Sequence, residues 1–205
     1  MTAESLHPVA PAASRLIYLH GFRSSPGSFK AKLLERRMTE LGHAERFVCP
    51  QLPVSPAEAI ALIEQQIAPQ PGDTLVGSSL GGYYATWLAE RHGCRAVLLN
   101  PAVDPAEGLR AHVGVQTMYH SDAPFVFEAR YLDELAALRA GPVAAFAQRL
   151  LLVAAKGDEL LDWRDMVARY PGAQQIVLEG SDHGLSDFAD LLDDVLRFAG
   201  FMPVG

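Results

Sequence analysis

Gly77-Ser78-Ser79-Leu80-Gly81-Gly82 is the stretch that decides the fold, because an apolar run precedes it and a helical pattern follows it. Residues 74–76 are typical of a buried strand, and residues 83–90 have the periodicity of a helix. A G-x-S-x-G sequence between a strand and a helix predicts a sharp, strained turn that presents the serine hydroxyl above a sheet. The flanking glycines leave room for that turn, and Gly82 allows the helix to approach the sheet. Ser79 is therefore the candidate nucleophile.

Two other kinds of glycine-rich turn also connect a strand to a helix, but each requires residues that this stretch lacks. A Walker-type phosphate loop requires Gly-Lys-Ser/Thr, and no lysine occurs here. A dinucleotide-binding turn requires G-x-G-x-x-G, and the three glycines have a different spacing. A purely structural turn that packs a helix on a sheet stays open, so the rest of the chain must supply a base and an acid for Ser79.

The overall composition excludes several classes of function. Of the 205 residues 49% are hydrophobic, and the formal net charge is −7 without any basic cluster. This charge argues against nucleic acid or an anionic membrane as the partner. Cys49 and Cys94 lie in or beside apolar runs, which favours buried thiols over a disulfide framework or a metal site. We expect a cytoplasmic protein that is a monomer by default.

The length predicts a single domain, residues 15–205, preceded by a flexible N-terminal tail, residues 1–14. The tail lacks the basic and apolar regions of a signal peptide. No run approaches the ~18 apolar residues of a spanning helix, so we expect no membrane insertion.

Apolar runs alternate with helical patterns along the domain. This alternation predicts an α/β fold with a compact, mostly parallel six-stranded sheet and helices on both faces. Residues 104–142 interrupt it with helical patches and no clear strand, so we expect a helical insertion after the fourth strand, a candidate cap. The expected strands lie at residues 15–19, 46–49, 74–76, 96–99, 150–155 and 175–178.

Two further polar residues follow expected strands. Asp158 comes directly after the fifth strand and His183 after the sixth, so the chain order is Ser79, Asp158, His183. This is the order of the α/β-hydrolase arrangement of a catalytic triad. A serine hydroxyl needs a base to take its proton, a histidine titrates near neutral pH, and a carboxylate orients the imidazole. Asp162 and Asp182 are alternative acids, but we expect Asp162 to begin the next helix, and Asp182 adjoins His183 in the chain.

The loop after the first strand supplies a candidate oxyanion hole. We expect its two N–H donors on Phe22 and on Leu80, the residue after the nucleophile. His20 is interpreted as holding the loop backbone together.

Lys156 and Arg23 are candidates to neutralise an acidic substrate group, although each also fits a solvated basic residue. The remaining histidines show no metal-ligand spacing, so no metal or cofactor is expected; they are His7, His43, His92, His112 and His120.

Five motifs carry a resemblance to a known family. They are Leu19-His20-Gly21-Phe22 with Ser24-Ser25-Pro26, residues 77–85, Leu99-Asn100-Pro101-Ala102, Gly157-Asp158-Glu159 with Leu161-Asp162, and Asp182-His183. Through them, residues 16–198 resemble the YqiA-like esterases, a branch of the α/β-hydrolase superfamily. The resemblance implies esterase activity on short acyl esters or acyl-CoA thioesters, with Ser79, Asp158 and His183 as the triad.

The function predicted from the sequence is a serine hydrolase that cleaves carboxylic esters through an acyl-enzyme on Ser79. Its partner would be a small-molecule ester or thioester. Two alternatives stay open: an acyl-CoA thioesterase or acyltransferase using the same triad, and a catalytically silent binding module with the hydrolase fold.

Overall fold

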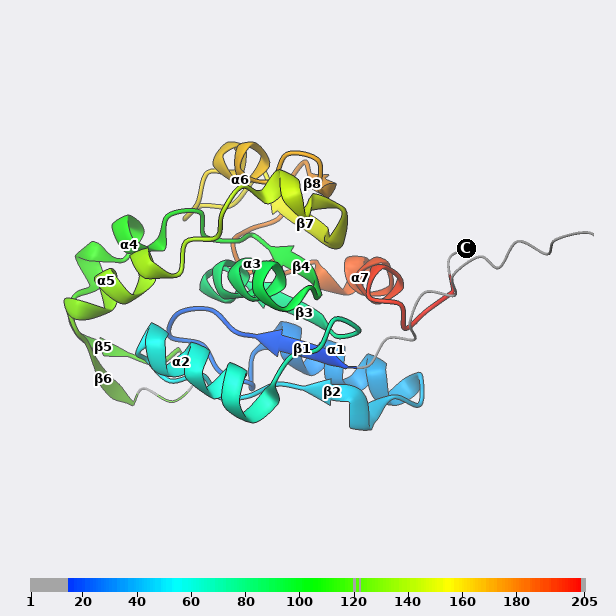
Figure 1. Ribbon diagram of the computed structural model, residues 1–205, viewed down its shortest axis with the longest axis horizontal. Helices are drawn as coiled ribbons and strands as arrows, with labels where there is room; N and C mark the ends of the chain where they lie inside the picture. The colour runs from blue at the N-terminus through cyan, green and yellow to red at the C-terminus, as the bar shows by residue number, and fades with distance from the viewer. Residues whose placement is uncertain (1–14, 120, 122, 204–205) are drawn as a thin grey trace, which may run out of the picture.

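The predicted six-stranded sheet is present, and every neighbouring pair of its strands is parallel (Figure 1). The computed structural model describes residues 15–119, 121 and 123–203, so the predicted tail, residues 1–14, lies outside the described part. The strand order is β2-β1-β3-β4-β7-β8. The strands are β1 (Leu16–Leu19), β2 (Phe47–Val48), β3 (Thr74–Ser78), β4 (Arg95–Leu99), β7 (Leu150–Ala155) and β8 (Gln174–Leu178).

The central strands are buried on both faces, which is why their sequences are continuous apolar runs without alternation. All residues of β1, β3 and β7 are buried, whereas β8 at the edge is half-exposed. The register aligns the carboxyl ends of the strands: Leu19 pairs with Gly77, and Leu99 pairs with Val153. The loops that follow these strands therefore meet at one edge of the sheet.

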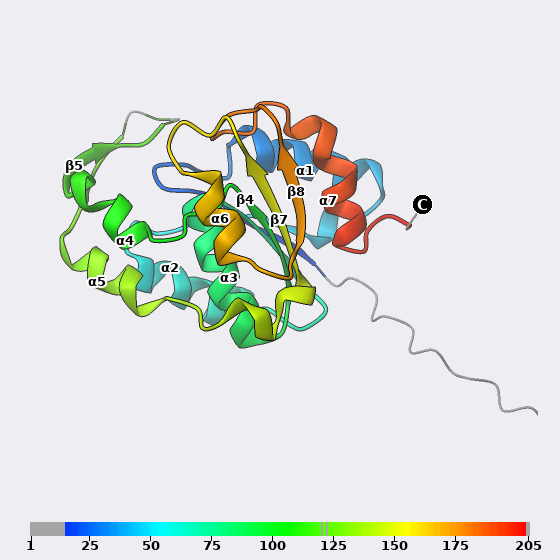
Figure 2. The same ribbon diagram turned by 90° about the horizontal axis from the view of Figure 1, so that it is seen from above.

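Helices cover both faces of the sheet, as predicted. One layer contains α1 (Phe29–Glu40) and α7 (Leu192–Phe198), whose apolar side chains pack together with one face of the strands. The other contains α2 (Pro56–Leu62), α3 (Leu80–His92) and α6 (Trp163–Arg169). Figure 2 shows the sheet between these two layers. The short helical turns are η1 (Ala44–Arg46), η2 (Ile63–Ile67), η4 (Val143–Ala145), η5 (Ala147–Arg149) and η6 (Phe188–Leu191).

Polar side chains start three of these helices. Ser28 accepts a hydrogen bond from the Ala31 N–H and Ser55 from the Glu58 N–H. Asp162 accepts one from the Arg164 N–H, so the expectation that Asp162 begins a helix is confirmed. Such caps satisfy amide donors that have no partner within the helix.

The inserted segment, residues 104–142, differs from the prediction because it contains a β-hairpin as well as helices. Its elements are α4 (Pro105–Gly108), η3 (Arg110–His112), β5 (Gly114–Thr117), β6 (Pro124–Phe127) and α5 (Arg130–Ala137). The expectation of no strand here was wrong, since β5 and β6 pair antiparallel with Val115 opposite Val126. Each strand has only four residues, and Gly114 and Pro124 at their starts weaken a strand pattern. The segment gathers at one end of the molecule, on the left in Figure 1.

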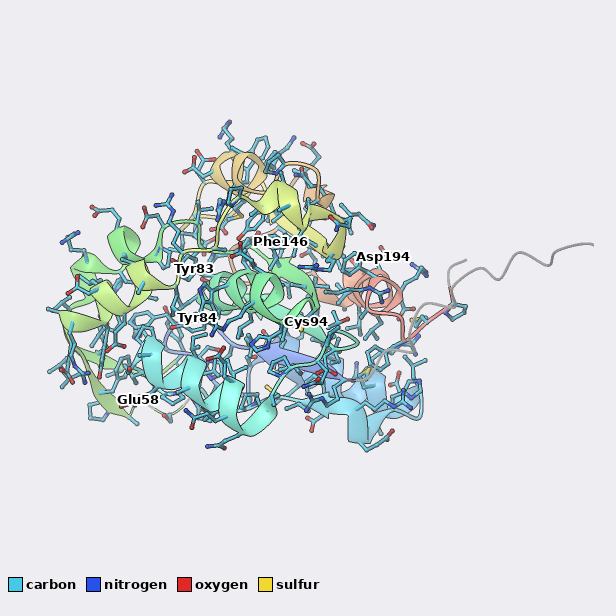
Figure 3. All side chains as sticks on the ribbon, viewed as in Figure 1. Glu58, Tyr83, Tyr84, Cys94, Phe146 and Asp194 are labelled. Atoms are coloured by element: carbon cyan, nitrogen blue, oxygen red, sulfur yellow. The ribbon has the colours of Figure 1, made fainter. Side chains whose placement is uncertain are left out.

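The inserted segment is attached to α2 and α3. The Tyr83 hydroxyl donates to the Leu135 carbonyl over 2.8 Å, and the Ser55 hydroxyl donates to the Glu134 carboxylate over 2.7 Å. Figure 3 shows Tyr83 and Tyr84 in the interior, on the side of α3 that faces the inserted segment.

Across the described ranges, no helix has both the length and the apolar character to cross a membrane.

Candidate active site

Ser79 lies in the strained turn between β3 and α3 that its sequence context predicts. Its φ is 54° and its ψ is −116°, a conformation that non-glycine residues rarely adopt. A Cβ atom on Gly77 would lie 2.2 Å from the Gly81 carbonyl oxygen, and one on Gly81 would lie 2.0 Å from the Leu19 carbonyl oxygen. Both positions therefore require glycine for the turn to form against β1.

The loops after β7 and β8 bring Asp158 and His183 to Ser79. His183 Nδ1 lies 2.8 Å from Asp158 Oδ2, and His183 Nε2 lies 3.0 Å from Ser79 Oγ. A carboxylate only accepts hydrogen bonds, so Nδ1 carries the hydrogen in this arrangement and Nε2 is left to accept from the serine hydroxyl. The arrangement is thus suited to transfer the Ser79 proton to His183.

The Asp158 side chain is fully buried, and its second oxygen is also satisfied. Asp158 Oδ1 accepts hydrogen bonds from the Leu160 and Leu161 N–H groups, both over 2.9 Å. The carboxylate is therefore oriented toward His183 by backbone donors. Of the alternative acids, Asp162 caps α6, and Asp182 accepts from the Ser186 N–H over 3.0 Å, which holds the Asp182 pKa below its usual value.

Asn100, at the end of β4, holds the loop that carries His183. Its side-chain amide donates to the carbonyls of Asp182 over 3.0 Å and His183 over 3.2 Å. Its oxygen accepts from the Ala155 N–H over 2.8 Å, and the residue is fully buried with φ 41°. Reasoning from the sequence assigned Asn100 no role outside the family resemblance, although a polar residue directly after a buried strand is a usable signal.

Phe22 and Leu80, the expected oxyanion donors, line the same cavity as Ser79. Among the described residues, neither backbone N–H donates to another protein atom. Both donors are thus available to a ligand in the cavity.

His20 holds the loop backbone, as expected. Its Nε2 accepts from the Leu52 N–H over 3.0 Å, so its Nδ1 carries the hydrogen and donates to the Gly21 carbonyl over 3.0 Å. Burial lowers the pKa of His20, which fits this neutral form.

A cavity of about 440 Å³ opens beside Ser79. The inserted segment and the loop after β4 supply an apolar wall, whereas β1, β3 and α1 supply a polar wall. The apolar wall includes Val103, Pro105 and Leu109, and the polar wall includes Tyr18, Ser28, Lys30 and Ser78. The cavity therefore offers chemically different surroundings to the two parts of a bound molecule.

Neither basic residue singled out in the sequence is free at this cavity. Lys156 pairs with Glu179 over 2.6 Å. Arg23 donates to the Thr117 carbonyl over 2.6 Å, and its guanidinium lies 4.4 Å from the centre of the Tyr119 ring. Lys30 does line the cavity, and sequence reasoning missed it. Its spacing of three and four residues from Leu33 and Leu34 was the available signal, since it places Lys30 on the buried face of α1.

Cys94 is a buried free thiol, as the sequence indicated, whereas the free thiol Cys49 is only half-buried. Within the described part of the chain, no group of three or more histidine, cysteine or acidic side chains is arranged to hold a metal ion.

The parallel sheet, the serine turn after β3 and the loops meeting above it define an α/β hydrolase fold. The chain belongs to the uncharacterised protein family UPF0227, the YqiA-like family, whose model matches residues 15–200.

Solved structures agree with this fold. The alpha/beta hydrolase domain-containing protein 10 from mouse is 17% identical, with a TM-score of 0.62, covering 94% of this chain and 92% of that one. The esterase domain of a Rhodothermus marinus protein is 18% identical, with a TM-score of 0.58 and coverages of 92% and 84%. The esterase RhEst1 from Rhodococcus sp. ECU1013 is 16% identical, with a TM-score of 0.57 and coverages of 91% and 90%. At these identities the likeness concerns the fold.

Proposed function

We propose that this protein is a serine esterase that hydrolyses carboxylic esters of short acyl chains. The observation that carries the proposal is the hydrogen-bonded series Asp158–His183–Ser79, with separations of 2.8 and 3.0 Å. Both distances lie in the range that proton transfer between a nucleophile and its base requires.

In the proposed first half-reaction, Ser79 Oγ attacks the ester carbonyl carbon while His183 Nε2 takes the hydroxyl proton. Asp158 stabilises the imidazolium that forms. The carbonyl oxygen becomes an oxyanion, which the free N–H groups of Phe22 and Leu80 stabilise. The carbon–oxygen bond to the alcohol then breaks, His183 returns the proton to the leaving alcohol, and an acyl-enzyme remains on Ser79.

The second half-reaction repeats these steps with water. His183 takes a proton from the water, whose oxygen attacks the acyl carbon, and Ser79 leaves as the proton returns to it. The products are a carboxylic acid and free enzyme. A thiol or a second alcohol in place of water would make the same acyl-enzyme an intermediate of acyl transfer, and a thioester substrate would make the protein a thioesterase.

Covalent labelling tests the proposed nucleophile directly. We expect a fluorophosphonate probe to modify the wild-type protein at Ser79, and expect neither Ser79→Ala nor His183→Ala to be labelled. Ser186→Ala is a matched control, because Ser186 is exposed and its backbone and hydroxyl bond to Asp182 rather than to Ser79 or the His183 ring. Labelling of Ser79→Ala at the wild-type rate would contradict the proposal.

Hydrolysis of 4-nitrophenyl butyrate provides the kinetic test. Loss of Ser79 is expected to lower kcat by about 10⁴-fold or more, since residues of a triad act as a unit. If the wild-type protein were neither labelled by the probe nor active on this ester, it would instead be a silent binding module.

A further inference from the structure

Lys30 places a buried positive charge in the cavity that contains Ser79. The residue lies in the first turn of α1 and is 9% exposed. Its ammonium donates a hydrogen bond to the Gly184 carbonyl, one residue beyond His183. Lys30, Ser79 and His183 all line the same cavity.

This ammonium has no carboxylate partner among the described residues. The two acids that raise the Lys30 pKa, Asp182 and Asp158, act on it through space, without a hydrogen bond. Both are engaged elsewhere, since Asp158 binds His183 and two backbone amides, and Asp182 binds the Ser186 amide. An ammonium has three hydrogens to donate, and Gly184 accepts one of them.

An unpaired charge in a protein interior is costly unless it is given a partner. Burial lowers the Lys30 pKa to about 8, which still leaves the side chain mostly charged at neutral pH. The structure therefore retains a cation with unused donors at a position that a bound molecule can reach.

The surroundings of Lys30 are suited to a small anionic group. The hydroxyl residues Tyr18, Ser28 and Ser78 line the cavity with it, whereas Val103 and Leu109 line its apolar wall. A carboxylate carries a single negative charge, which one ammonium neutralises. Tyr18 is hydrogen-bonded to both Ser28 and Ser78, which uses two of the three hydroxyl hydrogens and leaves one to donate to a carboxylate oxygen.

We propose that Lys30 determines specificity by binding a carboxylate of the substrate, so that the preferred substrates are esters that also carry a free carboxylate. The inference rests on the proposed esterase function and names its substrate class. The carboxylate would lie in the polar part of the cavity while the ester carbonyl lies at Ser79.

A competing role for Lys30 is purely positional, because its bond to Gly184 also steadies the chain beside His183. Substitution to glutamine separates the two roles. Lys30→Gln retains a hydrogen-bond donor but no charge, whereas Lys30→Met removes both. Lys32→Gln is the matched control, since Lys32 lies two residues further along α1 and is exposed.

The test compares charged substrates with neutral ones of the same shape. The charged substrates are 4-nitrophenyl monoesters of linear dicarboxylic acids with four to six carbons, and each is paired with its methyl ester. A second pair, 4-acetoxybenzoate and its methyl ester, carries the carboxylate on the alcohol side. The measured quantity is the charged-to-neutral ratio of kcat/KM, after subtraction of uncatalysed hydrolysis.

We expect the wild-type ratio to exceed one in at least one pair, and both Lys30 variants to lower it by roughly tenfold to a hundredfold, the range for a hydrogen bond to a charged group. Lys32→Gln should keep the wild-type ratio. A ratio that is unchanged in Lys30→Gln would overturn the proposal, even if Lys30→Met lost activity on every substrate, because that pattern belongs to a positional role.

Ligand binding separates failure of this inference from failure of the esterase function. Adipate is titrated calorimetrically into two proteins, the single variant Ser79→Ala and the double variant Ser79→Ala with Lys30→Gln. This measurement needs no catalysis. Binding that depends on Lys30 would support carboxylate recognition even if the wild-type protein hydrolysed no ester. Equal binding in the two backgrounds, or none in either, would overturn it while leaving the esterase proposal to the labelling experiment.

Discussion

Asn100 shows how one buried side chain organises three segments at the edge of the sheet. Its amide contacts the carbonyls of Asp182 and His183, and its oxygen contacts the Ala155 N–H. All three contacts are to backbone atoms, so their geometry sets the path of the loops rather than the chemistry at Ser79. Asn100 is therefore a positioning residue.

The substitution Asn100→Asp retains the acceptor for Ala155 and removes both donors. We expect kcat for a short ester to fall by about 10- to 100-fold with little change in KM, because His183 is no longer held at Ser79 while the cavity wall is preserved. The rate of fluorophosphonate labelling should fall in parallel. A change in thermal stability alone, with wild-type kcat, would show that Asn100 has only a structural role.

A second prediction at the scale of residues concerns how the contribution of Lys30 to the free energy of unfolding depends on pH. Its folded-state pKa is about 8 against an ordinary value of 10.5, so the unfolded chain binds more protons between these values. The contribution of Lys30 to the free energy of unfolding is therefore lowest below pH 8, rises as the pH increases from 8 to 10.5, and is constant above.

Lys30→Met should therefore stabilise the protein at pH 7, by about 1–3 kcal/mol once the lost Gly184 bond is subtracted. The gain should diminish toward pH 10. Urea unfolding at pH 7 and pH 10 measures both values. A variant that is less stable than the wild type at both pH values would contradict an energetic cost for the buried ammonium.

At the scale of elements, the hairpin β5–β6 supports the loop that carries Phe22. The Phe22 ring centroid lies 5.9 Å from that of Phe125 and 5.1 Å from that of Phe127, with edge-to-face geometry in both pairs. The Tyr119 N–H donates to the Arg23 carbonyl over 2.9 Å. The inserted hairpin and the proposed oxyanion donor are thus mechanically connected.

Phe127→Ala tests this connection. Phe127 is 1% exposed, so we expect the free energy of unfolding to fall by about 3–5 kcal/mol and kcat to fall because Phe22 loses its support. Val126→Ala is the control within the same strand, since Val126 is 56% exposed and should change stability by at most about 0.5 kcal/mol. Urea unfolding and ester kinetics report the two effects. An unaltered kcat in folded Phe127→Ala would show that the hairpin does not position the loop.

At the scale of the whole molecule, the inserted segment packs buried apolar side chains, among them Tyr131 and Leu135, into the same core as α2 and α3, and polar contacts add to this packing. The Tyr83 hydroxyl supplies one of them from inside the protein, and burial raises its pKa to about 12. Tyr83→Phe removes this donor and leaves the Leu135 carbonyl without it. We expect the free energy of local unfolding of α5 to fall by about 1–2 kcal/mol. Relative to the wild type, hydrogen exchange should therefore accelerate more in α5 than in β3. Uniform acceleration in both elements would indicate global destabilisation instead.

The sequence by itself determined the six strands of the parallel sheet and the helices that cover it, because their signals are local. Buried parallel strands are continuous apolar runs, capped helices begin at Ser28, Ser55 and Asp162, and Gly77 and Gly81 permit a turn that any side chain would block. In a parallel sheet the strand ends share one edge, so the order of Ser79, Asp158 and His183 also predicted that they would meet. Their roles stay a prediction, although their hydrogen bonds are as the chemistry requires.

Only the tertiary structure decided which other side chains reach the site. The hairpin β5–β6 was missed because four-residue strands with exposed faces are stabilised by pairing rather than by a sequence pattern. Lys30 and Asn100 were missed because their roles depend on contacts with residues 154 and 83 positions away, at Gly184 and His183. Local periodicity encodes which segments are helices or strands, whereas the chemistry of the cavity depends on how distant segments pack against one another.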